Sequence, residues 1–179
     1  MPNLRAALGR ASLFTAALLL GACAAPQPMP QLEGVPAAFE MSGRLAVRQG
    51  DRSEIARLRW TRKRDSDVWI IASPLGNEVA RIESTPEGAR LSQAGVGGGT
   101  VEAPSFEDLT QRLLGVALDP ALLAAWLHGR PPTQGPQAWT FVLEETQQAG
   151  AVTLAKRLSA SRGDVVVRLA VDSYQALAE

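Results

Sequence analysis

A two-residue alternation of apolar and polar side chains recurs through most of this chain, and it limits the possible folds more than any other feature. In its first run the apolar side chains share one face, while charged and small residues take the other: Phe39, Met41, Leu45 and Val47. This period is typical of half-buried strands. It returns in later segments: 56–60, 68–72, 77–84, 139–143, 152–154 and 165–171. Because the connections are short, successive strands are expected to form an antiparallel meander.

Between the two groups of strands the period becomes helical. Ser105 and Asp108 have the spacing of a capping box, and Gly115 is expected to end this first helix. Asp119 and Pro120 predict the start of a second helix. The apolar stripes are Phe106, Leu109 and Leu113, then Leu122, Leu123, Trp126 and Leu127. This order predicts a mainly β, α+β fold, in which a small helical insertion covers one curved antiparallel sheet.

Three segments are expected to connect strands. The charged stretch 61–67 and the motif Pro86-Glu87-Gly88 are predicted turns. The triplet Gly97-Gly98-Gly99 is predicted to be a flexible loop, since it lacks the lysine that follows the glycines of a phosphate-binding loop.

The N-terminus has the features of an export signal. Arg5 and Arg10 accompany an apolar run, 11–20, which is too short to span a bilayer. The motif Leu20-Gly21-Ala22-Cys23 then resembles a bacterial lipobox, in which a diacylglycerol group is attached to the cysteine before cleavage. We therefore expect residues 1–22 to be a lipoprotein signal peptide and Cys23 to be the lipid-attachment residue. The alternative is a plain secretory signal with an incidental cysteine.

A proline-rich segment follows Cys23, which is the only cysteine of the chain. Residues 23–38 contain few large apolar side chains, so we expect a lipidated tether there and a single domain over 39–179. An aspartate directly after the lipidated cysteine retains many lipoproteins in the inner membrane. Ala24 stands at that position, which favours a lipid-anchored protein of the cell outer membrane that faces the periplasm.

Several function classes have little support in the sequence. The formal net charge is +0 and no basic patch stands out, so nucleic acid is not an expected partner. One histidine, His128, and one lipidated cysteine are too few for a metal site, and no cofactor is expected besides the covalent lipid on Cys23. No G-x-S-x-G elbow is present, so we do not expect an enzyme. His128 is expected to be exposed or to cap a helix end.

Motifs spread along the chain resemble the LolB family of outer-membrane lipoprotein receptors. They occur in the family's order and spacing: Phe39-x-x-x-Gly43-Arg44-Leu45-Ala46-Val47, Trp60, Ser73-Pro74-Leu75-Gly76, Leu114-Gly115, and Leu118-Asp119-Pro120-x-x-Leu123-x-x-Trp126-Leu127-x-Gly129-x-Pro131. The resemblance covers Phe39 to Pro131 well and is looser toward the end. Two departures are a strand pair that is shortened or missing before Trp139, and Tyr174 at a position where tryptophan is common.

The resemblance implies a half-open antiparallel β-barrel with a small helical lid, the LolA/LolB-like fold. It implies a monomer that accepts cargo lipoproteins from a LolA-like periplasmic carrier and inserts them into outer-membrane lipid. Energy-independent transfer of acyl chains would drive this step. An exposed loop with an apolar residue would promote insertion, and the matching residues are Pro74, Leu75 and Gly76.

Two features of the residues themselves leave alternatives open. Turns lie at the surface, so Leu75 is either displayed to lipid or folded back onto the rim of the barrel. The expected acyl-chain cavity is an unfilled hollow lined by Leu45, Val47, Leu58, Trp60, Ile82, Leu113, Leu122 and Trp126. Since an apolar wall and an apolar core have the same pattern, the tryptophans are either core residues or cavity wall.

Two other functions fit the same sequence pattern. One is a structural accessory lipoprotein of an outer-membrane assembly complex, which would bind protein rather than lipid. The other is a soluble carrier of the same fold, which the lipobox disfavours.

Overall fold

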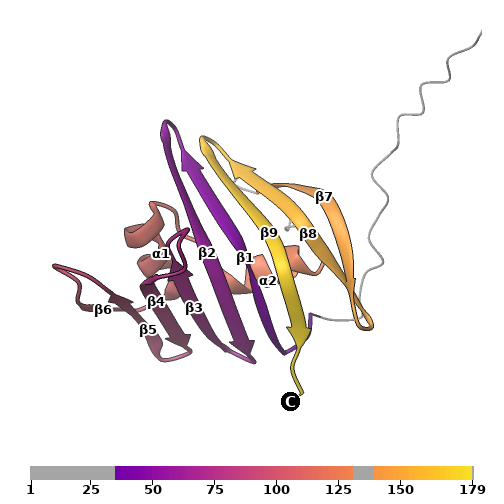
Figure 1. Ribbon diagram of the computed structural model, residues 1–179, viewed down its shortest axis with the longest axis horizontal. Helices are drawn as coiled ribbons and strands as arrows, with labels where there is room; N and C mark the ends of the chain where they lie inside the picture. Colours follow the sequence, from indigo (N-terminus) through magenta and orange to yellow (C-terminus); the bar gives the residue numbers. More distant parts are fainter. Residues whose placement is uncertain (1–34, 131–138, 179) are drawn as a thin grey trace, which may run out of the picture.

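The computed structural model describes residues 35–130 and 139–178 (Figure 1). The expected signal peptide, Cys23 and the tether up to residue 34 therefore lie outside the described residues, as does the segment 131–138 that precedes Trp139. The strands are β1 (Ala38–Gln49), β2 (Arg52–Lys63), β3 (Ser66–Ala72), β4 (Glu78–Thr85), β5 (Gly88–Gln93), β6 (Thr100–Ala103), β7 (Thr140–Ala149), β8 (Val152–Arg162) and β9 (Val165–Ala176). The helices are α1 (Phe106–Leu114) and α2 (Pro120–Leu127).

All nine strands form one antiparallel sheet in the order β6-β5-β4-β3-β2-β1-β9-β8-β7. The first six strands make one meander and the last three make another, and the two join where β1 pairs with β9. Both helices lie on the same face of this curved sheet, behind the strands in Figure 1. The edge strands β6 and β7 are not paired with each other, so the sheet is a half-open barrel. The predicted mainly β fold with a helical cover is confirmed.

Gly43 lies on β1 with its α-carbon close to the backbone of β9. A Cβ atom on Gly43 would lie 2.2 Å from the carbonyl oxygen of Ala170, a distance that no side chain tolerates. The register of the two strands also shifts between Ser42 and Gly43. A glycine in a strand commonly marks such a bulge or close approach, and here it lets the two meanders join.

The helix ends follow the predicted capping residues. The Ser105 hydroxyl accepts a hydrogen bond from the Asp108 amide at 3.2 Å, and the Asp119 carboxylate accepts one from the Ala121 amide at 2.7 Å. Gly115 adopts a positive φ of 75° at the end of α1, and its amide donates to the Gln111 carbonyl. Each cap satisfies backbone groups that a helix end leaves unpaired.

Two strand assignments from the sequence are corrected. The charged stretch 61–67 is not one turn, because β2 continues to Lys63 and β3 begins at Ser66. Its charged residues pair across this hairpin, with Arg62 opposite Asp67, so their density does not indicate a loop. The short strands β5 and β6 were not predicted from the sequence, although the predicted turn before Gly88 and the glycine loop after β5 are both present.

Candidate functional site: a covered apolar face and an exposed turn

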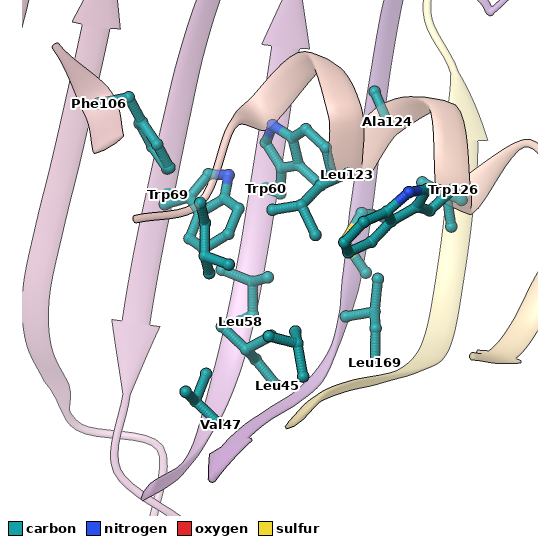
Figure 2. Packing of buried hydrophobic residues seen from close by; sticks show 14 of the residues in the cluster. Leu45, Val47, Leu58, Trp60, Trp69, Phe106, Leu123, Ala124, Trp126 and Leu169 are labelled. Atoms are coloured by element: carbon teal, nitrogen blue, oxygen red, sulfur yellow. The ribbon is translucent and has the colours of Figure 1, made fainter. Parts of the chain in front are cut away.

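The inner face of the sheet, which is the face that the helices cover, is apolar. The strand residues expected to line the cavity all lie there and are buried: Leu45, Val47, Leu58, Trp60 and Ile82. Figure 2 shows Leu45, Val47 and Leu58 on neighbouring strands, with Trp60 close to the helical segment above them. The period-two pattern therefore placed these side chains on the correct face.

The helical half of the predicted lining is only partly correct. Trp126, a residue of α2, is buried, but Leu113 and Leu122 are half-buried at the edge of the core. The buried α2 residues are instead Leu123, Ala124, Trp126 and Leu127. Figure 2 shows Leu123 and Trp126 directed from α2 toward the strands. A helix this short has an apolar residue at almost every position, so the sequence did not single out its inward side.

The expected open hollow is absent from the described part of the chain. A crevice lined by Leu45, Val47, Leu58 and Leu114, among others, has a volume of about 10 Å³. That is room for roughly one water molecule, and a fatty acyl chain does not fit. The expectation of an unfilled cavity is therefore wrong for this closed structure.

Aromatic side chains fill the space between sheet and helices. The Trp60 ring lies 4.9 Å from Phe39 and 5.6 Å from Trp69, measured between centroids, and Trp69 lies 4.8 Å from Phe106 on α1. On the other side, Trp126 packs edge-on against Trp139 at 5.3 Å. All four tryptophans are buried. In this structure they are core residues, one of the two alternatives that the sequence left open.

The three innermost indoles differ in their hydrogen bonding. The Trp60 Nε1–H donates to the Asp67 carboxylate at 2.6 Å, whereas Nε1 of Trp69 and Nε1 of Trp126 have no partner. A buried donor without an acceptor costs about 1–3 kcal/mol. The closed interior therefore leaves two polar donors unsatisfied beneath the helices.

Asp67 is a buried carboxylate at the edge of this aromatic cluster. Besides the indole of Trp60, it accepts a hydrogen bond from Arg62 Nη1 at 3.1 Å. Burial raises the pKa of Asp67, while the hydrogen bond from Trp60 and the charge of Arg62 act in the opposite direction. The two strands β2 and β3 are thus joined by a polar contact that links their hairpin to the core.

His128 is not exposed, which corrects one of the two expectations for it. It is fully buried at the C-cap of α2, where its Nδ1 lies 2.7 Å from the Ala124 carbonyl oxygen. Its Nε2 lies 2.9 Å from the Tyr174 hydroxyl, and both rings pack against Phe39. Burial lowers the pKa of His128 and raises the pKa of Tyr174 to about 12. The histidine is a structural connection between α2 and β9.

The turn that joins β3 to β4 displays Leu75 to solvent. The Ser73 amide donates to the Asn77 carbonyl and the Gly76 amide donates to the Ser73 carbonyl, both at 2.8 Å. Gly76 supports this turn with a positive φ of 94°. The Leu75 side chain is 91% exposed, so it does not fold back onto the rim of the barrel.

Two kinds of feature are absent from residues 35–130 and 139–178. No helix in this part of the chain is both long and apolar enough to cross a membrane. The same residues contain no group of histidine, cysteine and acidic side chains arranged to hold a metal ion.

An apolar sheet face covered by two short helices defines the protein as a half-open barrel of the LolA-like class. A solved LolA superfamily protein from Nitrosomonas europaea superposes with a TM-score of 0.51 at 9% identity, over 80% of this chain and 88% of that one. This likeness shows the fold. The family model "Outer membrane lipoprotein LolB" matches residues 37–174, and the chain belongs to the LolB family.

Curated relatives agree over nearly the whole length. An outer-membrane lipoprotein LolB from Azoarcus sp. (strain BH72) is 31% identical, over 90% of this chain and 92% of the relative. One from Thiobacillus denitrificans is also 31% identical, over 92% of this chain and 96% of the relative. The family that the motifs around Gly43, Leu75 and Trp126 resemble is thus confirmed.

Proposed function

We propose that this protein receives lipoproteins from a LolA-like periplasmic carrier and inserts them into the outer membrane by energy-independent transfer of their acyl chains. The observation that carries the proposal is an apolar sheet face closed only by two short helices, in a chain of the LolB family. Membership of this family and the names of its relatives favour this role over that of a structural accessory lipoprotein. The proposal requires no catalytic step.

Acyl chains need a protein that shields them from water, because hydrocarbon has a high free energy in water. Each methylene that leaves an apolar environment costs about 0.8 kcal/mol, so a multiply acylated cargo does not cross the periplasm unprotected. A carrier and a receptor must therefore pass the chains from one apolar interior to another. Transfer runs downhill in free energy when the receptor binds the chains only moderately and the bilayer binds them best.

The closed interior requires α1 and α2 to move before an acyl chain enters. These helices contain nine and eight residues, which is too short for a helix to be stable without packing. They are held by side-chain contacts with the sheet, and a hydrocarbon chain supplies contacts of the same kind. Ester and amide carbonyls of a lipidated cysteine would also supply acceptors for the unpartnered Nε1 atoms of Trp69 and Trp126.

In this proposal Leu75 is the side chain that touches the membrane during delivery. One fully transferred leucine contributes roughly 1.5–3 kcal/mol, which is weak for anchoring. The stable anchor would be the lipid on Cys23, since two or more acyl chains are needed for lasting attachment. The protein would then be anchored in the outer membrane and face the periplasm, with the tether allowing the domain to approach the bilayer.

The test is delivery of an acylated lipoprotein to liposomes by the full-length lipidated protein. Leu75→Glu is expected to leave folding and cargo binding nearly intact while delivery falls to the background of protein-free liposomes. Ala151→Glu adds the same charge to an exposed turn between β7 and β8 and is expected to deliver normally. Delivery by Leu75→Glu at the wild-type rate would remove Leu75 from the mechanism.

A second measurement separates the receptor from an accessory lipoprotein. A triacylated lipopeptide should displace a hydrophobic dye from the receptor, and native mass spectrometry should detect the complex. The same peptide without acyl chains is the control and should displace nothing. A protein that binds neither the dye nor the lipopeptide is not a receptor for acyl chains.

A further inference from the structure

A second connection of the sheet lies at the same end as the Leu75 turn. The strands β3, β4, β5 and β6 pair in sequence and antiparallel, so the connections 73–77 and 94–99 emerge at one end. The Ala94 amide donates to the Val79 carbonyl at 3.1 Å, which ties the base of the second connection to the first residues of β4. The two connections are two strand spacings apart, or about 10 Å.

The connection 94–99 displays one large apolar side chain, that of Val96, which is fully exposed. Glycines make up the rest of the turn apart from Ala94, and two of them, Gly95 and Gly97, have positive φ values of 103° and 82°. The Gln93 amide donates to the Gly99 carbonyl at 2.9 Å. Within this pair, the Gly98 amide donates to the Gly95 carbonyl and closes the turn. The backbone therefore holds Val96 at the tip of a hydrogen-bonded turn.

Exposed apolar side chains are concentrated at this end of the sheet. Among residues 35–130 and 139–178, the large hydrophobic side chains that are exposed are Ile55, Leu75, Val79, Val96 and Val142. The first four lie on or between β2 and β6 at the end where 73–77 and 94–99 emerge. A gathering of this kind marks an interaction surface more often than scattered single residues do.

The two connections also contain no charged residue: 73–77 is Ser-Pro-Leu-Gly-Asn and 94–99 is Ala-Gly-Val-Gly-Gly-Gly. At the opposite end of the same strands, the β2–β3 turn has Arg64 and Asp65 and the β4–β5 turn has Glu87. Charged side chains resist entry into the apolar boundary of a bilayer, whereas neutral turns with single apolar tips enter it readily. A lipid surface suits these turns better than a protein surface, which would offer charges and hydrogen bonds to match.

We propose that the turn 94–99 is a second membrane-contacting loop, and that Val96 enters the phospholipid surface beside Leu75. This inference rests on the proposed function, which places the protein at the outer membrane. One contact leaves the domain free to rotate about it, whereas two contacts fix how the sheet end faces the bilayer.

Residues 24–37 reach at most about 50 Å when fully extended, which exceeds the roughly 40 Å length of the twelve-residue strand β1. An anchor at Cys23 is thus compatible with this end touching the membrane.

Cys23 is the only cysteine of the chain, so the lipidated protein would contain no free thiol. A newly introduced cysteine would then be the single labelling site. Val96→Cys, Leu75→Cys and Glu87→Cys are each labelled with a polarity-sensitive fluorophore in the full-length lipidated protein. Each is reconstituted into phosphatidylethanolamine–phosphatidylglycerol vesicles that contain brominated lipids as quenchers. We expect quenching and a blue shift at positions 96 and 75 and neither at 87, which lies at the opposite end.

The outcomes separate this inference from the proposed function. Quenching at 75 without quenching at 96 overturns the second loop and leaves the Leu75 role intact. Shielding at 96 by added carrier in the absence of vesicles also overturns it, since the loop would then bind protein. In parallel, Val96→Glu is expected to reduce the rate of delivery to vesicles about tenfold without changing lipopeptide binding. Unchanged delivery by Val96→Glu contradicts the inference. If the wild-type protein does not bind the lipopeptide, the proposed function is contradicted instead.

Discussion

Nε2 of His128 accepts a hydrogen bond from the hydroxyl of Tyr174 at 2.9 Å, which joins the end of α2 to the last strand. The direction follows from the other ring nitrogen. Nδ1 faces the Ala124 carbonyl at 2.7 Å, and a carbonyl only accepts, so Nδ1 carries the proton. Nε2 of the neutral ring is then the acceptor, and the tyrosine is the donor that satisfies a fully buried histidine.

Removing that donor should destabilise the domain. Tyr174→Phe keeps the ring that stacks on Phe39 but leaves Nε2 of His128 buried without a partner. We expect the free energy of unfolding in urea to fall by about 1–3 kcal/mol. Ser173→Ala removes an exposed hydroxyl that bonds to Ser42 and should change it by less than about 0.5 kcal/mol. Equal effects of the two variants would argue against a structural role for the His128–Tyr174 contact.

The lowered pKa of His128 predicts a loss of stability in mild acid. Above its ordinary pKa of 6.5, the ring is neutral in both the folded and the unfolded chain. Below that pH the unfolded chain takes up a proton first, so the free energy of unfolding falls as the pH decreases. Urea unfolding at pH 7.5, 6.5 and 5.5 measures this slope.

His128→Gln provides the comparison for the pH measurement. The variant lacks the titrating ring, so its stability should change less with pH than that of the wild type over the same range. The difference between the two slopes isolates the histidine from Asp67, whose pKa burial shifts in the upward direction. Parallel slopes would assign the pH dependence to other groups.

The close approach at Gly43 predicts a strong effect of a single methyl group. In Gly43→Ala the new Cβ meets the Ala170 carbonyl oxygen at 2.2 Å, so β1 and β9 must separate. Overpacking of this kind costs about 1–3 kcal/mol, measured as a lower midpoint of thermal or urea unfolding. Gly99→Ala is the matched control, since nothing lies within 4 Å of its added Cβ, and it should unfold like the wild type.

Entry of lipid should be detectable as loosening of the two helices. When a triacylated lipopeptide binds, amide hydrogen exchange is expected to increase in α1 and α2 and to stay slow where β1 pairs with β9. The peptide without acyl chains should leave every rate unchanged. Binding without any change in helix exchange would mean that the chains enter by another route.

The sequence predicted the elements whose local chemistry is distinctive. The alternation from Phe39 onward identifies β1, and the residue pairs Ser105–Asp108 and Asp119–Pro120 identify the starts of both helices, because capping needs those side chains at those positions. The β3–β4 turn could be predicted equally well, since Pro74 and Gly76 determine its geometry.

Features that depend on distant partners were not predictable in the same way. His128 lies 46 residues from Tyr174, and without that partner nothing in the sequence indicates burial. The filled interior was missed because Trp60 and Trp126 have the same sequence pattern whether they line a cavity or pack against other aromatic side chains of the core. For β5 the period-two signal covers only a few residues, too few to separate a strand from a loop.

The gap between β6 and β7 determines how the interior can grow. A closed barrel has a fixed circumference, because any expansion must break hydrogen bonds between neighbouring strands. Here the two edge strands are not paired with each other. The curvature of the sheet can therefore decrease while every inter-strand hydrogen bond is kept and only side-chain contacts change. An expansion of that kind would leave the backbone hydrogen bonds of the sheet in place, which suits the proposed uptake and release of acyl chains.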